Sequence, residues 1–304
     1  MVAFQHSGEA LTDTLATTGH AAAAGGSNHS EGNVFVELLH HLKDSNELEL
    51  PFLGHIHLPQ VSPFSVIGIP IDLSITKHVV FLWIAAIILI LIASYAARQN
   101  RKNIVPRGFG NMMEVLVQFV REEIVRPNMG DAGIKYLPYL LTTFFFILMM
   151  NILGLLPYGS SATGNVSVTG GLAAIAFVMI QVAAIKSQGL GHYLAHLTGG
   201  VHWTLWIIMV PIEIIGLFTK PFALCIRLFA NMTAGHVVIV SLFGLIFLYK
   251  SFVIAPGPVL FAVGINLLEL FVAVLQAYIF TMLTALFMGL GMQTEHEEHE
   301  EHAH

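Results

Sequence analysis

Charged residues are scarce in this chain. Asp, Glu, Lys and Arg make up only 11% of its 304 residues, whereas soluble domains carry about 25%. Apolar residues make up 55%, and several apolar stretches reach the roughly 20 residues that a helix needs to cross a bilayer. The composition excludes an ordinary soluble domain and predicts an all-α protein that crosses a membrane several times.

Cysteine is nearly absent as well. The single Cys225 excludes an internal disulfide framework. It lies within an apolar run, so we expect a small buried side chain there. The net charge of −6 comes largely from an acidic tail and gives no reason to expect a nucleic-acid partner. No cofactor and no metal site are predicted.

Composition divides the chain into three parts. Residues 1–75 are expected outside the membrane, on the periplasmic side, and the first ~32 are small, polar and predicted to be disordered. They lack the continuous apolar core of a cleaved secretory signal, and residues 33–75 combine a short helical pattern with Pro-rich extended pieces. Residues 76–294 form the predicted membrane domain. Residues 295–304, rich in Glu and His, are expected to be a disordered cytoplasmic tail.

The first three crossings can be placed from hydropathy and charge. An apolar run at 79–97 is followed at once by Arg98, Arg101, Lys102 and Arg107. The positive-inside rule therefore places the end of this run in the cytoplasm and the N-terminus outside. Residues 111–126 have apolar residues at helical spacing and predict a helix on the cytoplasmic surface. The second and third crossings are expected at 137–156 and 168–185.

The last two apolar runs are too long for upright crossings. Residues 203–249 would form a helix of about 70 Å, against a hydrocarbon core of about 30 Å. The run is either two crossings broken at Lys220–Pro221 or one long, tilted helix. Because residues 259–291 are also overlong, a tilted antiparallel pair accounts for both lengths. That arrangement predicts five crossings and a cytoplasmic C-terminus; six crossings would place the tail outside.

Arg227 lies in the middle of the first long run. An arginine at the centre of a membrane helix costs at least ~2.5–3.5 kcal/mol, so we expect it to have a task or a neutralising partner. At about 100° per residue, Asn231 shares the face of Arg227, and His236 lies on the opposite face. Glu269 and Gln276 share a face of the last helix. In an antiparallel pair, this spacing predicts that Gln276 meets Arg227 and that Glu269 meets His236.

Four motifs together resemble one known family. They are RLFANMTAGH (227–236), NILGLLP (151–157), PIEIIGLFTKP (211–221) and ELFVAVLQAYIF (269–280). In this order they resemble subunit a of rotary F-type ATP synthases, over about residues 79–291. The resemblance implies a bacterial inner-membrane protein of the membrane sector, CF(0), that is not itself an enzyme. It implies a ring of c subunits and the b subunits of the peripheral stalk as partners.

The resemblance also implies a role for the arginine. Each c subunit of that family carries a carboxylate within the membrane. Arg227 would attract each ionised carboxylate as it passes and would prevent protons from leaking directly between two half-channels. Gln276 would either support Arg227 or take part directly, and the sequence leaves both possibilities open.

The remaining polar residues are assigned to the half-channels. Many bacterial members carry Glu at the position of His236 and His at that of Glu269; here the two are exchanged, as in mitochondrial relatives. A carboxylate and an imidazole in contact can hold and pass a proton, so this pair is assigned to the outside half-channel. Asn231 and Asn151 are expected to line it, or Asn151 forms a hydrogen bond between helices instead. Glu213 is assigned to the cytoplasmic exit half-channel.

Two other functions compete with this interpretation. A secondary transporter with a charged midplane site is expected to show internal repeats, and the arginine stretch has no second copy. A structural membrane scaffold would not need aligned ionisable residues. The sequence leaves open the number of c subunits, and it favours the proton over sodium only through the His236–Glu269 pair.

Overall fold

The computed structural model defines two compact units. The first comprises Met1–Val80 and Thr233–Leu268, and the second comprises Phe81–Met232 and Glu269–His304; each is described by itself. The residues that the structure describes are 47–50, 54–57, 64–66, 69–71, 76–102, 108–156, 162–191, 193, 206–249 and 256–293. The helical pattern near residue 40, the predicted disorder of residues 1–32 and the tail 295–304 lie outside the described residues.

The first unit contains two short β-hairpins. Strand β1 (Glu47–Leu50) pairs antiparallel with β2 (Gly54–His57), and β3 (Phe64–Val66) pairs antiparallel with β4 (Ile69–Ile71). Pro70 in β4 lies opposite Ser65; a proline is tolerated there because both strands of a two-stranded ribbon are edge strands. Extended segments between residues 33 and 75 are therefore paired with one another where the structure describes them.

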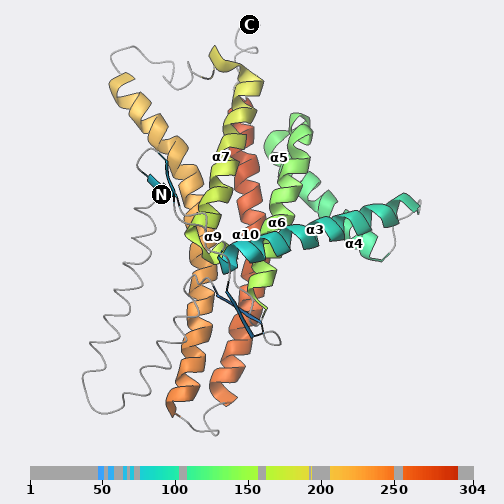
Figure 1. Cartoon of the computed structure of the whole chain (residues 1–304). Coiled ribbons are helices and arrows are strands. Elements are labelled where there is room, and N and C mark those ends of the chain that lie inside the picture. Colours follow the sequence, from blue (N-terminus) through green and yellow to red (C-terminus); the bar gives the residue numbers. More distant parts are fainter. Residues whose placement is uncertain are drawn as a thin grey trace. The chain divides into compact units, whose positions relative to one another are not determined.

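Five helices of the described residues are long and apolar enough to cross a membrane (Figure 1). This confirms the all-α membrane fold and the number of crossings favoured from the sequence. The helices are α3 (Lys77–Lys102), α6 (Leu137–Gly154), α7 (Val166–Gln188), α9 (Trp206–Tyr249) and α10 (Pro256–Gln293).

Helix α9 continues through the position where a break was possible. Pro211 and Pro221 both lie inside its 44 residues. An internal proline removes one backbone hydrogen bond and commonly bends a helix instead of ending it, and Figure 1 shows a bend in the first half of α9. At 1.5 Å per residue, α9 is about 66 Å long and α10 about 57 Å. Both exceed the hydrocarbon thickness, as expected of tilted helices.

The predicted surface helix is more irregular than its sequence pattern indicates. Helix α4 (Phe109–Phe119) passes into the π-helical turn η1 (Val120–Val125), the short α5 (Arg126–Met129) and the 3-10 turn η2 (Asp131–Tyr136). Met112 and Val115 are exposed on α4, whereas Val120 and Ile124 are fully buried. The wider π turn rotates the residues that follow, so one part of the apolar stripe is free to meet lipid and the other enters the core.

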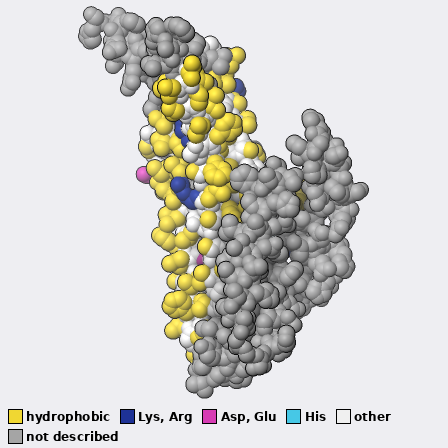
Figure 2. Space-filling model, turned by 90° about the vertical axis from the view of Figure 1, so that its left-hand side faces the viewer, with side chains coloured by type: hydrophobic (Ala, Val, Ile, Leu, Met, Phe, Trp, Pro, Cys, Tyr) yellow, Lys and Arg dark blue, Asp and Glu magenta, His cyan; other side chains and the backbone are white. Residues whose placement is uncertain are grey.

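The core of the second unit lies between α6, α7, α9 and α10. Helix α6 contributes Leu140, Phe144 and Ile147, which are buried together with small side chains from α7 and α10 such as Ala176 and Ala277. Small residues allow helix backbones to approach closely in lipid. Among the described side chains on the face drawn in Figure 2, apolar ones predominate and basic ones form only small patches.

Candidate functional site

Polar residues of α9 and α10 meet inside the second unit. The side-chain amide of Asn231 donates to Oε1 of Gln276 across 2.8 Å. Further along, the ammonium of Lys220 lies 5.1 Å from the centre of the Phe287 ring, which is a cation–π distance. From the first contact to the second, the position on α9 falls by 11 residues while that on α10 rises by 11. These parts of the two helices therefore run antiparallel, as predicted.

The register of this pair differs by one turn from the predicted register. The two contacts place Arg227 level with Phe280, which is four residues, or about 6 Å, from Gln276. The side chain that meets Gln276 is Asn231, and the sequence had placed Arg227 there. Helical periodicity predicts the face of each residue, but the depth at which two helices meet depends on how their side chains interlock.

Arg227 is half-buried on α9, beside the buried stripe formed by Leu224, Leu228 and Met232. Within the described part of the chain, its guanidinium makes no hydrogen bond or ion pair. A guanidinium remains protonated under all ordinary conditions, and a charge within a membrane is tolerated when it is paired. Arg227 therefore carries a permanent charge that has no hydrogen-bond or ion-pair partner among the described residues.

Glu269 and Gln276 both lie on the buried face of α10, as their spacing predicted. Their side chains are 4% and 2% exposed. Ala273 and Ala277, on the same face, are fully buried, and their small size leaves room for the two longer side chains. The amide nitrogen Nε2 of Gln276 is buried without a hydrogen-bond partner among the described residues, so a donor is available beside Asn231.

Asn151, at the end of α6, is fully buried. Its Nδ2 donates to the backbone oxygen of Ala273 across 3.3 Å, and its Oδ1 accepts a hydrogen bond of 2.8 Å from the hydroxyl of Thr163. Thr163 lies in the 3-10 turn η3 (Ala162–Gly164). The structure thus brings together residues far apart in sequence beside the face of α10 that carries Glu269 and Gln276.

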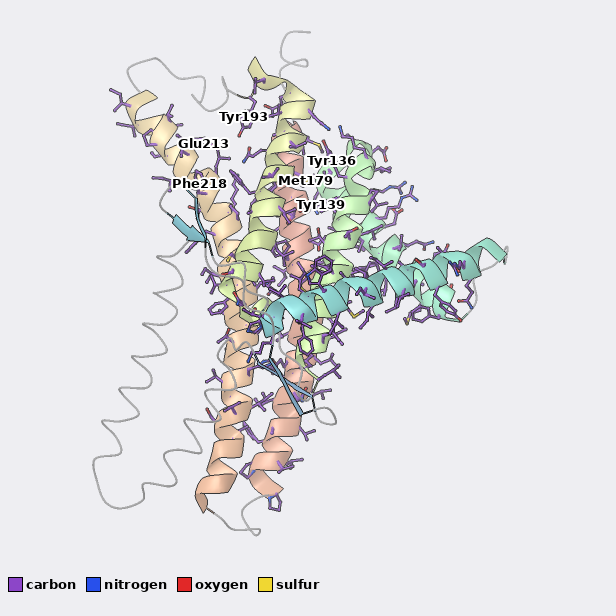
Figure 3. All side chains as sticks on the ribbon, viewed as in Figure 1. Tyr136, Tyr139, Met179, Tyr193, Glu213 and Phe218 are labelled. Atoms are coloured by element: carbon purple, nitrogen blue, oxygen red, sulfur yellow. The ribbon has the colours of Figure 1, made fainter. Side chains whose placement is uncertain are left out.

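Glu213 is half-buried near the start of α9, and Figure 3 shows it at the same end of the second unit as Tyr193. The Tyr193 hydroxyl donates to Oε1 of Gln181 on α7. Partial burial raises the pKa of Tyr193, and the negative charge of the Glu213 carboxylate raises it further. Tyr193 thus stays protonated to higher pH than usual, and its hydroxyl remains a donor to Gln181 over that range.

Residues 79–289 match the family described as ATP synthase A chain. The chain belongs to that family. This confirms the resemblance to subunit a of the F-type ATP synthases that the four motifs indicated. It also identifies the chain as a multi-pass membrane protein of the ATP synthase A chain family, in agreement with its five apolar helices.

Curated members of the ATP synthase A chain family match nearly the whole chain. A protein named ATP synthase subunit a from Chlorobium phaeobacteroides (strain BS1) is 53% identical over 276 residues, which cover 90% of this chain and 80% of the relative. Its namesake from Chloroherpeton thalassium is 52% identical over 88% of this chain and 80% of its own length. That of Anaeromyxobacter dehalogenans is 46% identical over 96% of this chain and 79% of its own.

Two further residues of this A-chain family member were singled out in the sequence. Cys225 is buried, with its sulfur 3.5 Å from the hydroxyl of Thr169, so the expectation of a small buried side chain is confirmed. His236 is half-buried in α9. It belongs to the first unit and Glu269 to the second, so the pairing of these two residues stays a prediction.

Three polar residues of the site in this family member could not be recognised from the sequence patterns. Thr163 lies in a loop rich in small polar residues, where nothing distinguishes it from its neighbours. Tyr193 lies beyond the predicted third crossing, in a stretch where no pattern singled it out. Gln181 had the clearest signal, since it is a polar amide within an otherwise apolar crossing.

Proposed function

We propose that the chain is the stator proton-channel subunit of an F-type ATP synthase. It would pass protons through two offset half-channels to and from a rotating ring of c subunits, and this flow drives ATP synthesis. The observation that carries the proposal is the state of Arg227. It is a permanently charged side chain on an apolar helix, half-buried, and without a hydrogen bond or ion pair in the described part of the chain.

The arginine acts by electrostatics. A carboxylate on a ring subunit is tolerated in the membrane when it is protonated or paired, so the ionised form is attracted to Arg227. The same fixed positive charge repels a proton that would otherwise pass directly between the half-channels. The driving force is about 2.3 kcal/mol per charge for each 100 mV of membrane potential, and the subunit itself breaks no bonds.

The remaining polar residues define the two half-channels. His236 and Glu269 form the relay of the outside half-channel, beside Asn231 and Asn151. The burial of Glu269 and the contact of Asn231 with Gln276 support this assignment. On the cytoplasmic side, Glu213 serves the exit half-channel, supported by its electrostatic interaction with Tyr193.

The assembly follows from the family and the charge pattern. The c-ring lies against the Arg227 face, and the b subunits of the peripheral stalk are further partners. Residues 1–75 lie on the periplasmic side, 76–294 form the membrane domain and 295–304 lie in the cytoplasm of a bacterial cell. The basic residues after the first crossing support this orientation in the inner membrane.

Substitution of the arginine tests the function. Arg227→Ala should abolish ATP synthesis while the complex still assembles, and it should increase passive proton flux after the soluble head is removed. Lys220→Ala is the matched control. It removes another cation of α9, one that already contacts the Phe287 ring, and should retain synthesis. Normal synthesis in Arg227→Ala, or purification of the protein without a ring of small membrane subunits, would contradict the proposed function.

A further inference from the structure

A short chain of hydrogen bonds joins three segments of the second unit. The hydroxyl of Thr163 in η3 donates to Asn151 on α6, and Asn151 donates in turn to the backbone oxygen of Ala273 on α10. All three residues are 0% exposed. We call the side chains of Asn151 and Thr163 the α10 clamp.

The hydrogen bond from Thr163 determines which atom of the Asn151 amide faces α10. A hydroxyl can donate only one hydrogen bond, and the one from Thr163 goes to Oδ1 of Asn151. The amide is therefore oriented with Nδ2 towards α10, where it donates to the Ala273 oxygen across 3.3 Å. A carbonyl oxygen has two lone pairs, so Ala273 can accept this bond in addition to its helical one. Removal of the Thr163 hydroxyl deprives the buried Oδ1 of Asn151 of this hydrogen bond, which is destabilising.

The α10 clamp contacts α10 at Ala273, which lies between Glu269 and Gln276 along the helix. Ala273 lies about one turn from Glu269 on one side and slightly less than one turn from Gln276 on the other. Both of those side chains are buried on the same face of α10. A contact to the backbone between them restricts how far α10 slides along its axis and how far it rotates.

From the sequence, Asn151 is expected to contribute to the polar lining of the outside half-channel. The geometry points to a different role, because both polar atoms of its amide bind protein groups and none of its surface is exposed. We propose that Asn151 and Thr163 are positioning residues that set the depth and rotation at which α10 presents Glu269 and Gln276. This proposal rests on the proposed function in one respect: it takes Glu269 and Gln276 to belong to the proton path.

A conservative pair of substitutions at Thr163 provides the sharpest test. Thr163→Val keeps the shape and removes the hydroxyl, whereas Thr163→Ser keeps the hydroxyl. In membrane vesicles with the soluble head removed, Thr163→Val should lower proton flux by roughly threefold to tenfold, the range expected for one interhelical hydrogen bond in lipid. Thr163→Ser should stay near the wild type. Asn151→Leu removes both hydrogen bonds of the clamp and should cause at least as large a loss. The double variant should be no worse than Asn151→Leu, since the Thr163–Asn151 bond is then already lost.

The pH profile separates positioning from simple destabilisation. Thr163→Val and Asn151→Leu should displace the pH of half-maximal flux in the same direction, because both move the same carboxylate. A general loss of folded subunit would lower flux equally at every pH. If Thr163→Val conducts like the wild type while Asn151→Leu does not, Asn151 lines the path directly and the proposal is overturned.

Hydrogen–deuterium exchange tests the clamp without reference to proton transport. In the assembled complex, amides of residues 269–280 should exchange faster in Thr163→Val and Asn151→Leu than in the wild type or Thr163→Ser. Unchanged exchange would overturn the clamp, and faster exchange with unaltered flux and pH profile would overturn its role in transport. Normal ATP synthesis in Arg227→Ala would refute the proposed function separately, and the exchange result would still decide the clamp.

Discussion

Glu269 is a carboxylate almost fully buried within an apolar helix. Burial of a charged group costs free energy unless the group is paired or neutralised, so a side chain that neutralises Glu269 is expected nearby. His236 is the predicted partner, because a carboxylate and an imidazole in contact can hold and pass a proton. The pair would then act as one acid–base unit divided between two helices.

Exchange of the two residues tests whether they act as a unit. His236→Glu and Glu269→His should each lower ATP-driven proton pumping in vesicles, since each leaves two like groups. The double variant restores one carboxylate and one imidazole and should recover much of the lost pumping, as the non-additivity of contacting residues requires. A double variant no better than the worse single one would show that the outside half-channel uses other groups.

At the scale of elements, the end of α10 is fitted closely to its neighbours in the second unit. The side-chain amide of Gln188 donates to the backbone oxygen of Gly291 across 2.6 Å. The hydroxyl of Ser187 donates to the backbone oxygen of Met292 across 3.4 Å. Both bonds satisfy carbonyls that a helix C-terminus leaves without partners. A Cβ atom at Gly289 would lie 1.8 Å from the backbone oxygen of Asn128. Only glycine fits at this contact between α10 and α5.

Gly289→Ala should therefore destabilise the subunit. Overpacking commonly costs about 1–3 kcal/mol, and backbone atoms cannot move aside as a flexible side chain does. Gly171→Ala on α7 is the control, because a Cβ there has no heavy atom within 4 Å. The measurement is the melting temperature of the purified complex and the amount of subunit retained in it. Equal stability of the two variants would refute this account of the α10–α5 contact.

At the scale of the whole molecule, an odd or even number of membrane crossings decides whether the two ends of the chain lie on opposite sides or on the same side. Five membrane-competent helices in the described residues predict that the two ends of the chain lie on opposite sides. The six-crossing alternative placed a break at Lys220–Pro221, whereas α9 runs without interruption from Trp206 to Tyr249. The basic residues after α3 predict which end lies in the cytoplasm.

Cysteine labelling tests this topology. With Cys225 replaced by serine, no native thiol remains. A membrane-impermeant maleimide should then label Gly26→Cys only from the outside and Ala303→Cys only from the cytoplasmic side. The matched variant without any cysteine should remain unlabelled. Labelling of both positions from one side would mean an even number of crossings.

The sequence by itself determined the features that depend on local composition and periodicity. Apolar length predicted membrane-spanning helices, because a bilayer admits few other structures for such segments, and the excess length of both final runs favoured five crossings over six. Helical spacing placed Glu269 and Gln276 on one face of α10. The four motifs indicated the family, which the match over residues 79–289 confirmed.

Tertiary structure decided what depends on contacts between distant segments. Periodicity does not specify how far one helix slides along another, so the pairing of Gln276 with Asn231 had to come from packing. The role of Thr163 could not be predicted from local sequence either, because its hydroxyl gains a structural role only when folding brings it to Asn151. The π turn at Val120–Val125 likewise reflects the fit of buried side chains to their neighbours, which local patterns do not encode.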